Sequence, residues 1–402
     1  MSNDQLFQSR ATEIQSLSLT QIEAWSTFAR SAAIPNPFFE PECQIPSDDF
    51  HVDGGSNCEL LVAEHEGEIV ACVPVHITRP GIGPFRRRVA HSRSVWTPVS
   101  FGALLVSPTM EDHSISSLLA AMRCWSREGG PGIAVFDWLD DDAYGTGGQI
   151  RAVCEEQGIP LLIRRMWERP VARRLGANLS LRETMSATSR RKLERNQRRL
   201  ESALGGIMEL VDRSGDPLAV DEFLKLESSG WKGPGGFAYA VRPEAEQWFR
   251  ALCANFAALG RLQLLSLEVA GRTVVMQCWI TGGDVAYGMR IGHDAELSTF
   301  GPGRLMHVAA IDHLDSIGIN LADPCASPGD ASRGNAVLNS LYKQRRPMVT
   351  LAIATGGYVD RSALRAVKFV APFVERSRRI RRPAKALTKA SDLVLESESV
   401  DE

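Results

Sequence analysis

The stretch from Tyr287 to Leu305 carries the clearest chemical signal in the sequence. A strand-like run leads into a turn, and Gly301-Pro302-Gly303 then opens a helix with apolar residues at helical spacing. The first backbone N–H groups of such a helix have no intrahelical acceptor and stand at the positive end of its dipole. We predict an anion site here, suited to a pyrophosphate. An ordinary glycine- and proline-punctuated helix start is the alternative interpretation.

Other catalytic signatures are absent from the sequence. It has no G-x-G-x-x-G or Walker A loop, no H-E-x-x-H and no G-x-S-x-G. His307 and His313 share one predicted helix but stand about 240° apart around it, so they do not face one metal. The eight cysteines lie far apart, which excludes C-x-x-C pairs. We expect no metal and no covalent enzyme intermediate.

The overall charge is close to neutral, but the charges are segregated. The chain has 45 Lys and Arg against 48 Asp and Glu in 402 residues, which argues against a protein that coats nucleic acid. Residues 182–199 hold seven basic and two acidic side chains, and residues 375–389 hold seven and one. The segment at 182–199 lacks interleaved aromatic residues, so we expect no sequence-specific nucleic-acid binding. It is either a solvated helix face or a surface that binds anions.

The elements that must position these residues occur twice. Residues 58–79 and 262–281 each read as a strand hairpin, and an offset of 204 aligns Leu60 with Leu264 and Gly67 with Gly271. A helix-like stretch and a buried strand follow each hairpin. This pattern predicts a tandem duplication in an α/β (α+β) fold. We place the first domain at 1–177, the second at 178–358, and a basic then acidic tail at 359–402.

Three motifs of the second domain resemble the GNAT acyltransferase superfamily, and in particular its FemAB-like, CelD/BcsL-type acetyltransferases. They are the Arg-rich helix that contains Arg190-Arg191-Lys192-Leu193, the segment from Phe223 through Glu227 to Trp231-Lys232-Gly233, and Ser298–Leu305 followed by Asp323-Pro324-Cys325-Ala326. The match covers residues 180–358 well and the first domain more loosely. The resemblance implies tandem domains, each a twisted, mixed, mostly antiparallel sheet flanked by helices.

The resemblance also implies acyl transfer from an acyl-CoA co-substrate, such as acetyl-CoA, to an amine or hydroxyl. The donor is then expected at Thr299, Phe300, Gly301, Gly303 and Arg304. Candidates for contact with the acceptor are Trp231, Lys232, Tyr287 and Arg290. The loop that holds Trp231 and Lys232 is equally well interpreted as a flexible surface segment with a packed tryptophan.

Transfer from a thioester requires a base for the acceptor and a proton for the leaving thiolate. Our candidates are Glu227 as the base and Tyr342 as the acid, with Asp323 and His293 as weaker alternatives. A surface carboxylate and a packed aromatic side chain are the competing interpretations of Glu227 and Tyr342.

The expected acceptor is a small molecule or a precursor of envelope polysaccharide, and the expected location is the cytoplasm. A basic amphipathic stretch in the tail suggests either peripheral membrane contact or packing against the body of the protein; its apolar residues are Leu364, Val367, Val370, Phe373 and Val374. Two alternative functions stay open. One is aminoacyl-tRNA-dependent transfer to a cell-wall precursor, and the other is a catalytically silent accessory role in cellulose or exopolysaccharide synthesis. The sequence leaves the oligomeric state undetermined.

Overall fold

The computed structural model describes residues 11–50, 58–80, 87–92, 101–142, 145–174, 180–229, 238–327 and 333–366. The first half contributes β1 (Ala11–Glu13), α1 (Leu19–Ser31), α2 (Pro41–Asp49), β2 (Cys58–His65), β3 (Glu68–Thr78), β4 (Val89–His91), β5 (Leu105–Val106), α3 (Glu111–Arg127), β6 (Ile133–Asp140), α4 (Thr146–Glu156) and β7 (Leu161–Arg173). Its short 3₁₀ turns are η1 (Ile14–Ser16) and η2 (Pro37–Phe39). We call β1 to β7 the first copy.

The second half begins with an added helix and then repeats this order of elements. It contributes α5 (Ala187–Leu204), β8 (Met208–Asp212), α6 (Ala219–Ser229), α7 (Pro243–Ala258), β9 (Leu262–Val269), β10 (Arg272–Gly282), β11 (Val285–His293), α8 (Pro302–Ser316), β12 (Leu321–Asp323), α9 (Arg333–Leu341) and β13 (Gln344–Ala354). Its 3₁₀ turns are η4 (Leu181–Thr184), η5 (Tyr239–Val241) and η6 (Ala295–Phe300). We call β8 to β13 the second copy.

The two hairpins show the duplication most directly. The bounds of β2 and β3 and those of β9 and β10 differ by the same 204 positions. Both connecting turns have positive φ at each central residue, 52° and 82° at Glu66 and Gly67, and 51° and 76° at Ala270 and Gly271. Positive φ at both positions is the type I′ geometry that matches the twist of paired strands. The predicted duplication and fold class are confirmed.

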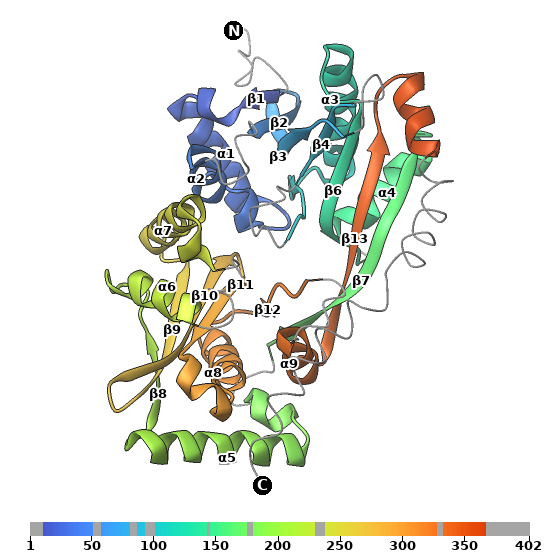
Figure 1. Cartoon of the computed structure of the whole chain (residues 1–402). Coiled ribbons are helices and arrows are strands. Elements are labelled where there is room, and N and C mark those ends of the chain that lie inside the picture. The colour runs from blue at the N-terminus through green and yellow to red at the C-terminus, as the bar shows by residue number, and fades with distance from the viewer. Residues whose placement is uncertain are drawn as a thin grey trace, which may run out of the picture.

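The strands form one mixed sheet in the order β1-β2-β3-β4-β6-β13-β7-β12-β11-β10-β9-β8, with β5 paired to β3 (Figure 1). Among the described strand pairs, only β4 with β6 and β11 with β12 are parallel. These two pairs occupy corresponding places in the two copies. Helices cover both faces in the second copy: Leu264 packs into the core with α6 and α7, and the next residue, Leu265, into the core with α8.

The two copies exchange their last strands. β13 belongs to the second copy, but it lies between β6 and β7 of the first copy. The end of β7 in turn pairs with β12 of the second copy, through Arg173 and Ala172. Figure 1 shows β7 and β13 as two long strands that run between the halves. Each copy therefore completes the sheet of the other.

A buried chain of four charges marks the centre of this exchange. Arg169 on β7 and Arg346 on β13 are direct cross-strand partners. Arg169 donates to Asp323 at 3.1 Å, and Arg346 lies 3.6 Å from both Asp323 and Asp140. Asp140 and Asp323 each end the corresponding strand of their copy, β6 and β12. We call these four residues the ion chain; their net charge is zero, as burial of charge requires.

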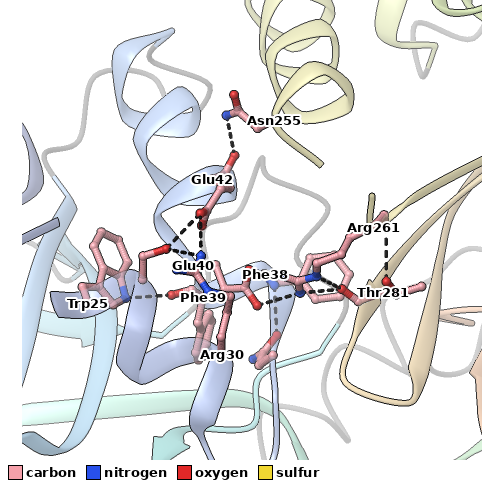
Figure 2. Close-up of polar contacts among 11 residues, drawn as sticks. Trp25, Arg30, Phe38, Phe39, Glu40, Glu42, Asn255, Arg261 and Thr281 are labelled. Carbon is pink, nitrogen blue, oxygen red and sulfur yellow. Dashed lines mark hydrogen bonds and ion pairs between the residues drawn. The ribbon is translucent and has the colours of Figure 1, made fainter. Parts of the chain in front are cut away.

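A second polar seam joins α2 to the second copy (Figure 2). The buried carboxylate of Glu40 accepts two hydrogen bonds from the guanidinium of Arg261, at 2.6 and 2.8 Å. Arg261 also donates to the Thr281 carbonyl, and Asn255 on α7 donates to the Glu42 carbonyl at 3.0 Å. The planar guanidinium of Arg261 is thus held by three acceptor atoms, which fixes both the distance and the orientation of the two halves.

The tail beyond β13 begins with a helical stretch at residues 358–366. Leu364 is buried there against Val89, Val135 and two alanines of β13. This part of the predicted amphipathic face packs on the body of the protein. Val367, Val370, Phe373 and Val374 lie outside the described residues.

Removal of one charge from the ion chain is expected to leave its partners buried and unpaired. Arg346→Met keeps much of the apolar volume beside Phe101 but leaves Asp140 without its cation and weakens the pairing of Asp323. We expect the free energy of unfolding to fall by about 3–5 kcal/mol in chemical denaturation. Arg164→Met, at an exposed position on β7, is the control and should change it by less than about 0.5 kcal/mol. Equal stability of the two variants would contradict the role of the ion chain.

Candidate active site in the second copy

The N-terminus of α8 begins at a glycine and has no side-chain cap. Gly301 is its N-cap residue in the left-handed region, with φ 65° and ψ 47°, and no side chain caps the helix. Gly301 N–H donates to the Ser298 carbonyl and Arg304 N–H to the Gly301 carbonyl, while Pro302 has no N–H. The Gly303 N–H has no acceptor within the described part of the chain. One backbone donor therefore stands open at the positive end of a fifteen-residue helix.

The side chains of this turn leave space beside Gly303. A Cβ at Gly303 would meet only Ile291 within 4 Å, at 3.7 Å. Arg304 turns away to donate to Ser340 on α9, and Thr299 is exposed at the end of η6. Phe300 lies under the guanidinium of Arg199 on α5, 5.5 Å from the ring centroid. The five predicted donor-binding residues thus line one turn, flanked by α9 and α5.

The sheet opens next to this turn. Parallel pairing of β11 with β12 ends at Tyr287 and Asp323, whereas β11 continues to His293. The register of β11 against β10 jumps between Gly288 and Arg290, so Met289 is a bulged residue. Gly288 has no room for a side chain, because a Cβ there would lie 3.1 Å from the Pro324 Cα. The two strands therefore diverge at a fixed point, over which α8 packs.

Glu227 lies on the opposite side of β11 from α8. It is 1% exposed, so the alternative interpretation as a surface carboxylate is wrong. Its Oε2 accepts from the Tyr239 N–H at 2.8 Å, and its Oε1 lies 3.6 Å from the Nε of Arg290. Arg290 also stacks over the Tyr239 ring at 4.8 Å. Gly292 permits this approach, since a Cβ there would lie 2.7 Å from the Glu227 nitrogen.

Tyr342 belongs to a buried polar network beneath α8. Its hydroxyl lies 3.0 Å from the Nδ1 of His307, and the amide nitrogen of Gln277 approaches the same Nδ1 at 3.4 Å. An amide nitrogen can only donate, so Nδ1 is the acceptor and the tyrosine hydroxyl donates to it. Burial raises the pKa of Tyr342 and lowers the pKa of His307 to about 4. The pair is therefore a neutral phenol bonded to a neutral imidazole.

Other predicted residues lie elsewhere. Tyr287 is fully buried between Phe38 and Phe101 of the first copy. Asp323 belongs to the ion chain, and the His293 carbonyl accepts from Ser229. Trp231 and Lys232 lie outside the described residues.

The corresponding helix of the first copy, α3, begins with a different sequence. It starts at Glu111 and Asp112, where α8 starts at Pro302 and Gly303. The two copies therefore differ in residue type at this helix start.

Within the ranges that the structure describes, no group of three or more His, Cys, Asp or Glu side chains lies close enough together to hold a metal ion. No helix in those ranges is long and apolar enough to cross a membrane.

Comparisons with known proteins find one family model and several similar solved structures. Residues 187–331 match the family model of an acetyltransferase (GNAT) domain. The solved structure of FemX is 11% identical, with 83% of this chain and 94% of that chain covered and a TM-score of 0.54. A conserved protein of unknown function from Bacteroides thetaiotaomicron is 12% identical, with 84% and 98% covered and a TM-score of 0.50. A tandem GNAT protein from the clavulanic acid biosynthesis pathway is 15% identical, with 86% and 98% covered and a TM-score of 0.45. A comparison with curated protein sequences finds no significant match.

The chain thus shares its fold with FemX. Residues 187–331, which include η6, α8 and β12, match an acetyltransferase (GNAT) domain, and this match supports an acyltransferase.

The main residues that sequence reasoning missed are those that join the copies, Arg169, Arg346, Asp140 and Glu40. A signal for two of them was present, because Arg-Pro occurs at 169–170 and again at 346–347, in corresponding strands. No local pattern marks Glu40, whose partner Arg261 lies more than two hundred positions away.

The lowered pKa of His307 makes stability depend on pH in a defined direction. In the unfolded chain this histidine takes up a proton near pH 6.5, but the folded protein resists protonation down to about pH 4. The contribution of His307 to stability is therefore intact above pH 6.5 and is lost as the pH falls towards 4, by about 1.4 kcal/mol per pH unit. Chemical denaturation of wild type and His307→Gln at several pH values measures it. The stability difference between the two proteins should shrink over this range, and a constant difference would contradict the assignment.

Proposed function

We propose that the chain is an acyl-CoA-dependent N- or O-acyltransferase whose single donor site lies in the second copy. The observation that carries the proposal is the open, uncapped N-terminus of α8 beside the divergence of β11 and β12. The pyrophosphate of the donor binds at the Gly301–Gly303 turn, and the thioester arm enters between the two strands. In the first copy the sequence has Glu111 and Asp112 where α8 has Pro302 and Gly303, and negatively charged residue types there disfavour an anionic donor.

The reaction forms a bond from the acceptor nitrogen or oxygen to the acyl carbon and breaks the carbon–sulfur bond. Glu227 is the proposed base, since its carboxylate is held in one orientation by the Tyr239 N–H, with Arg290 beside it. The acceptor then approaches from the α6 side of β11, beside Arg290. The irregular backbone at Met289 is suited to stabilise charge that develops on the thioester oxygen.

Tyr342 is the proposed acid for the leaving thiolate. Burial raises the pKa of Tyr342, which keeps the proton on the phenol at neutral pH. Its hydrogen bond to His307 holds the ring, and rotation of the hydroxyl proton towards the sulfur completes the transfer.

We assign the acceptor to small molecules or precursors of envelope polysaccharide, which rests on the resemblance to CelD/BcsL-type proteins. The corresponding location is the cytoplasm, with peripheral membrane contact through the basic tail. A second candidate donor is an aminoacyl-tRNA, favoured by the exposed basic face of α5, and a catalytically silent accessory role is a third candidate function.

The donor site can be tested by calorimetry with acetyl-CoA, longer acyl-CoAs and CoA. We expect wild type to bind, and Gly303→Trp to weaken binding at least 100-fold because the indole fills the space beside the open N–H. Gly303→Ala should retain the fold, since its Cβ makes only ordinary contacts. Thr109→Trp, at the exposed turn before α3, is the matched control and should leave binding unchanged.

If no CoA species binds wild type, the acyl-CoA assignment is wrong. Binding of an aminoacyl-tRNA with a steep dependence on salt would then favour the second candidate donor.

Steady-state kinetics of Glu227→Gln and Tyr342→Phe test the proton transfers. Each variant keeps the shape of the side chain and removes one ionisable group, so we expect kcat to fall about 10²–10⁴-fold with little change in KM for the donor. Loss of the base should also change the pH dependence of kcat. A loss of thermal stability with an unchanged kcat would instead show that the residue is only structural.

A further inference from the structure

Helix α5 carries two stripes of charged and polar residues on different sides. Ser186 caps its start, Gly205 ends it in the left-handed region, and Leu193 and Leu200 are its buried residues. Lys192, Asn196 and Arg199 follow one another at i, i+4 and i+7, which places them on one side of the helix. Arg191, Arg195 and Arg198 repeat this spacing on the side opposite the buried leucines. We call these the inner and the outer stripe.

The inner stripe lies against the anion turn. The amide nitrogen of Asn196 is 3.3 Å from the position that a Cβ on Gly301 would occupy. Arg199 stacks over Phe300, the residue directly before Gly301. Lys192 stands one turn of α5 before Asn196 on the same side, so a cation flanks Asn196 in each direction along the helix. Both cations are exposed.

Neither cation has a carboxylate partner among the described residues. None of the described carboxylates lies within ion-pair distance of Lys192 or Arg199. The acidic residues of η6 and its cap, Asp294 and Glu296, are paired with Arg272 instead. Arg195 adds to the positive charge of α5. Basic residues lie three and four positions before it and after it, and like charges at this spacing repel each other and destabilise a helix. An external anion relieves this repulsion.

We propose that the inner stripe binds the 3′-phosphate of the adenosine in acyl-CoA, as an extension of the donor site. This inference rests on the proposed function, which places the pyrophosphate at the Gly301–Gly303 turn, because the inner stripe is the cationic surface directly beside that turn. A phosphate monoester carries up to two negative charges and accepts from ammonium and guanidinium groups alike. Lys192 and Arg199 lie about 10 Å apart along the helix axis, so they approach the group from two sides.

Calorimetry with CoA and 3′-dephospho-CoA tests this assignment. We expect wild type to bind CoA at least about tenfold more tightly than dephospho-CoA, as charge-assisted hydrogen bonds to one phosphate permit. Lys192→Ala/Arg199→Ala should lose this preference and bind dephospho-CoA as wild type does. The matched control, Arg191→Ala/Arg198→Ala, removes the same charge from the outer stripe and should keep the preference.

Three results would overturn the proposal. Equal binding of CoA and dephospho-CoA by wild type would show that the 3′-phosphate is not recognised, although the donor site would stand. An equal loss of preference in both double variants would show a long-range charge effect rather than a site on the inner stripe. No binding of either nucleotide would refute the proposed donor site itself. All four substituted side chains are exposed, so circular dichroism and thermal melting should match wild type.

Discussion

The ion chain is the interaction on which the arrangement of the two copies depends. Two arginines that face each other across β7 and β13 would repel strongly if they were buried alone. Asp140 and Asp323 come from the ends of corresponding strands in different copies, so the charges balance only when both copies are in place. The strand exchange and the charge balance therefore require each other, which explains how one continuous sheet forms from two repeated units.

This constraint reaches the candidate active site through Asp323. The same residue accepts from Arg169, pairs in register with Tyr287 on β11, and accepts from the Cys325 N–H through its other oxygen. It is the last point at which β11 and β12 lie side by side. The place where the strands diverge, and hence the path proposed for the thioester, is set by a buried charge whose partner is on a strand of the first copy. Precise placement of reacting groups requires this kind of rigid support.

Sequence patterns predicted the local elements well and the pairings between copies poorly. The hairpins, the helix at 303–316 and the strand at 285–291 have clear periodicity and turn residues, and they lie where expected. Strand exchange leaves no such mark, because β13 reads as an ordinary buried strand whichever sheet it joins. Glu227 illustrates the same limit, since its burial depends on Gly292 and Tyr239 rather than on its own helix. The predicted domain boundary between residues 177 and 178 stays a prediction. β7 precedes this boundary and β13 follows it, yet the two strands are neighbours in the sheet.

The difference between the helix starts explains why duplication need not give two active sites. A donor site needs an open helix terminus, whereas the fold needs only the helix. The first copy contributes packing, with Phe38 and Phe101 enclosing Tyr287. In α8 glycine and proline leave the terminus uncompensated, and the inner stripe adds further positive charge beside it. Among the described residues, this helix start combines an open backbone donor with two exposed cations that no described carboxylate pairs, which is the setting that the proposed polyanionic donor requires.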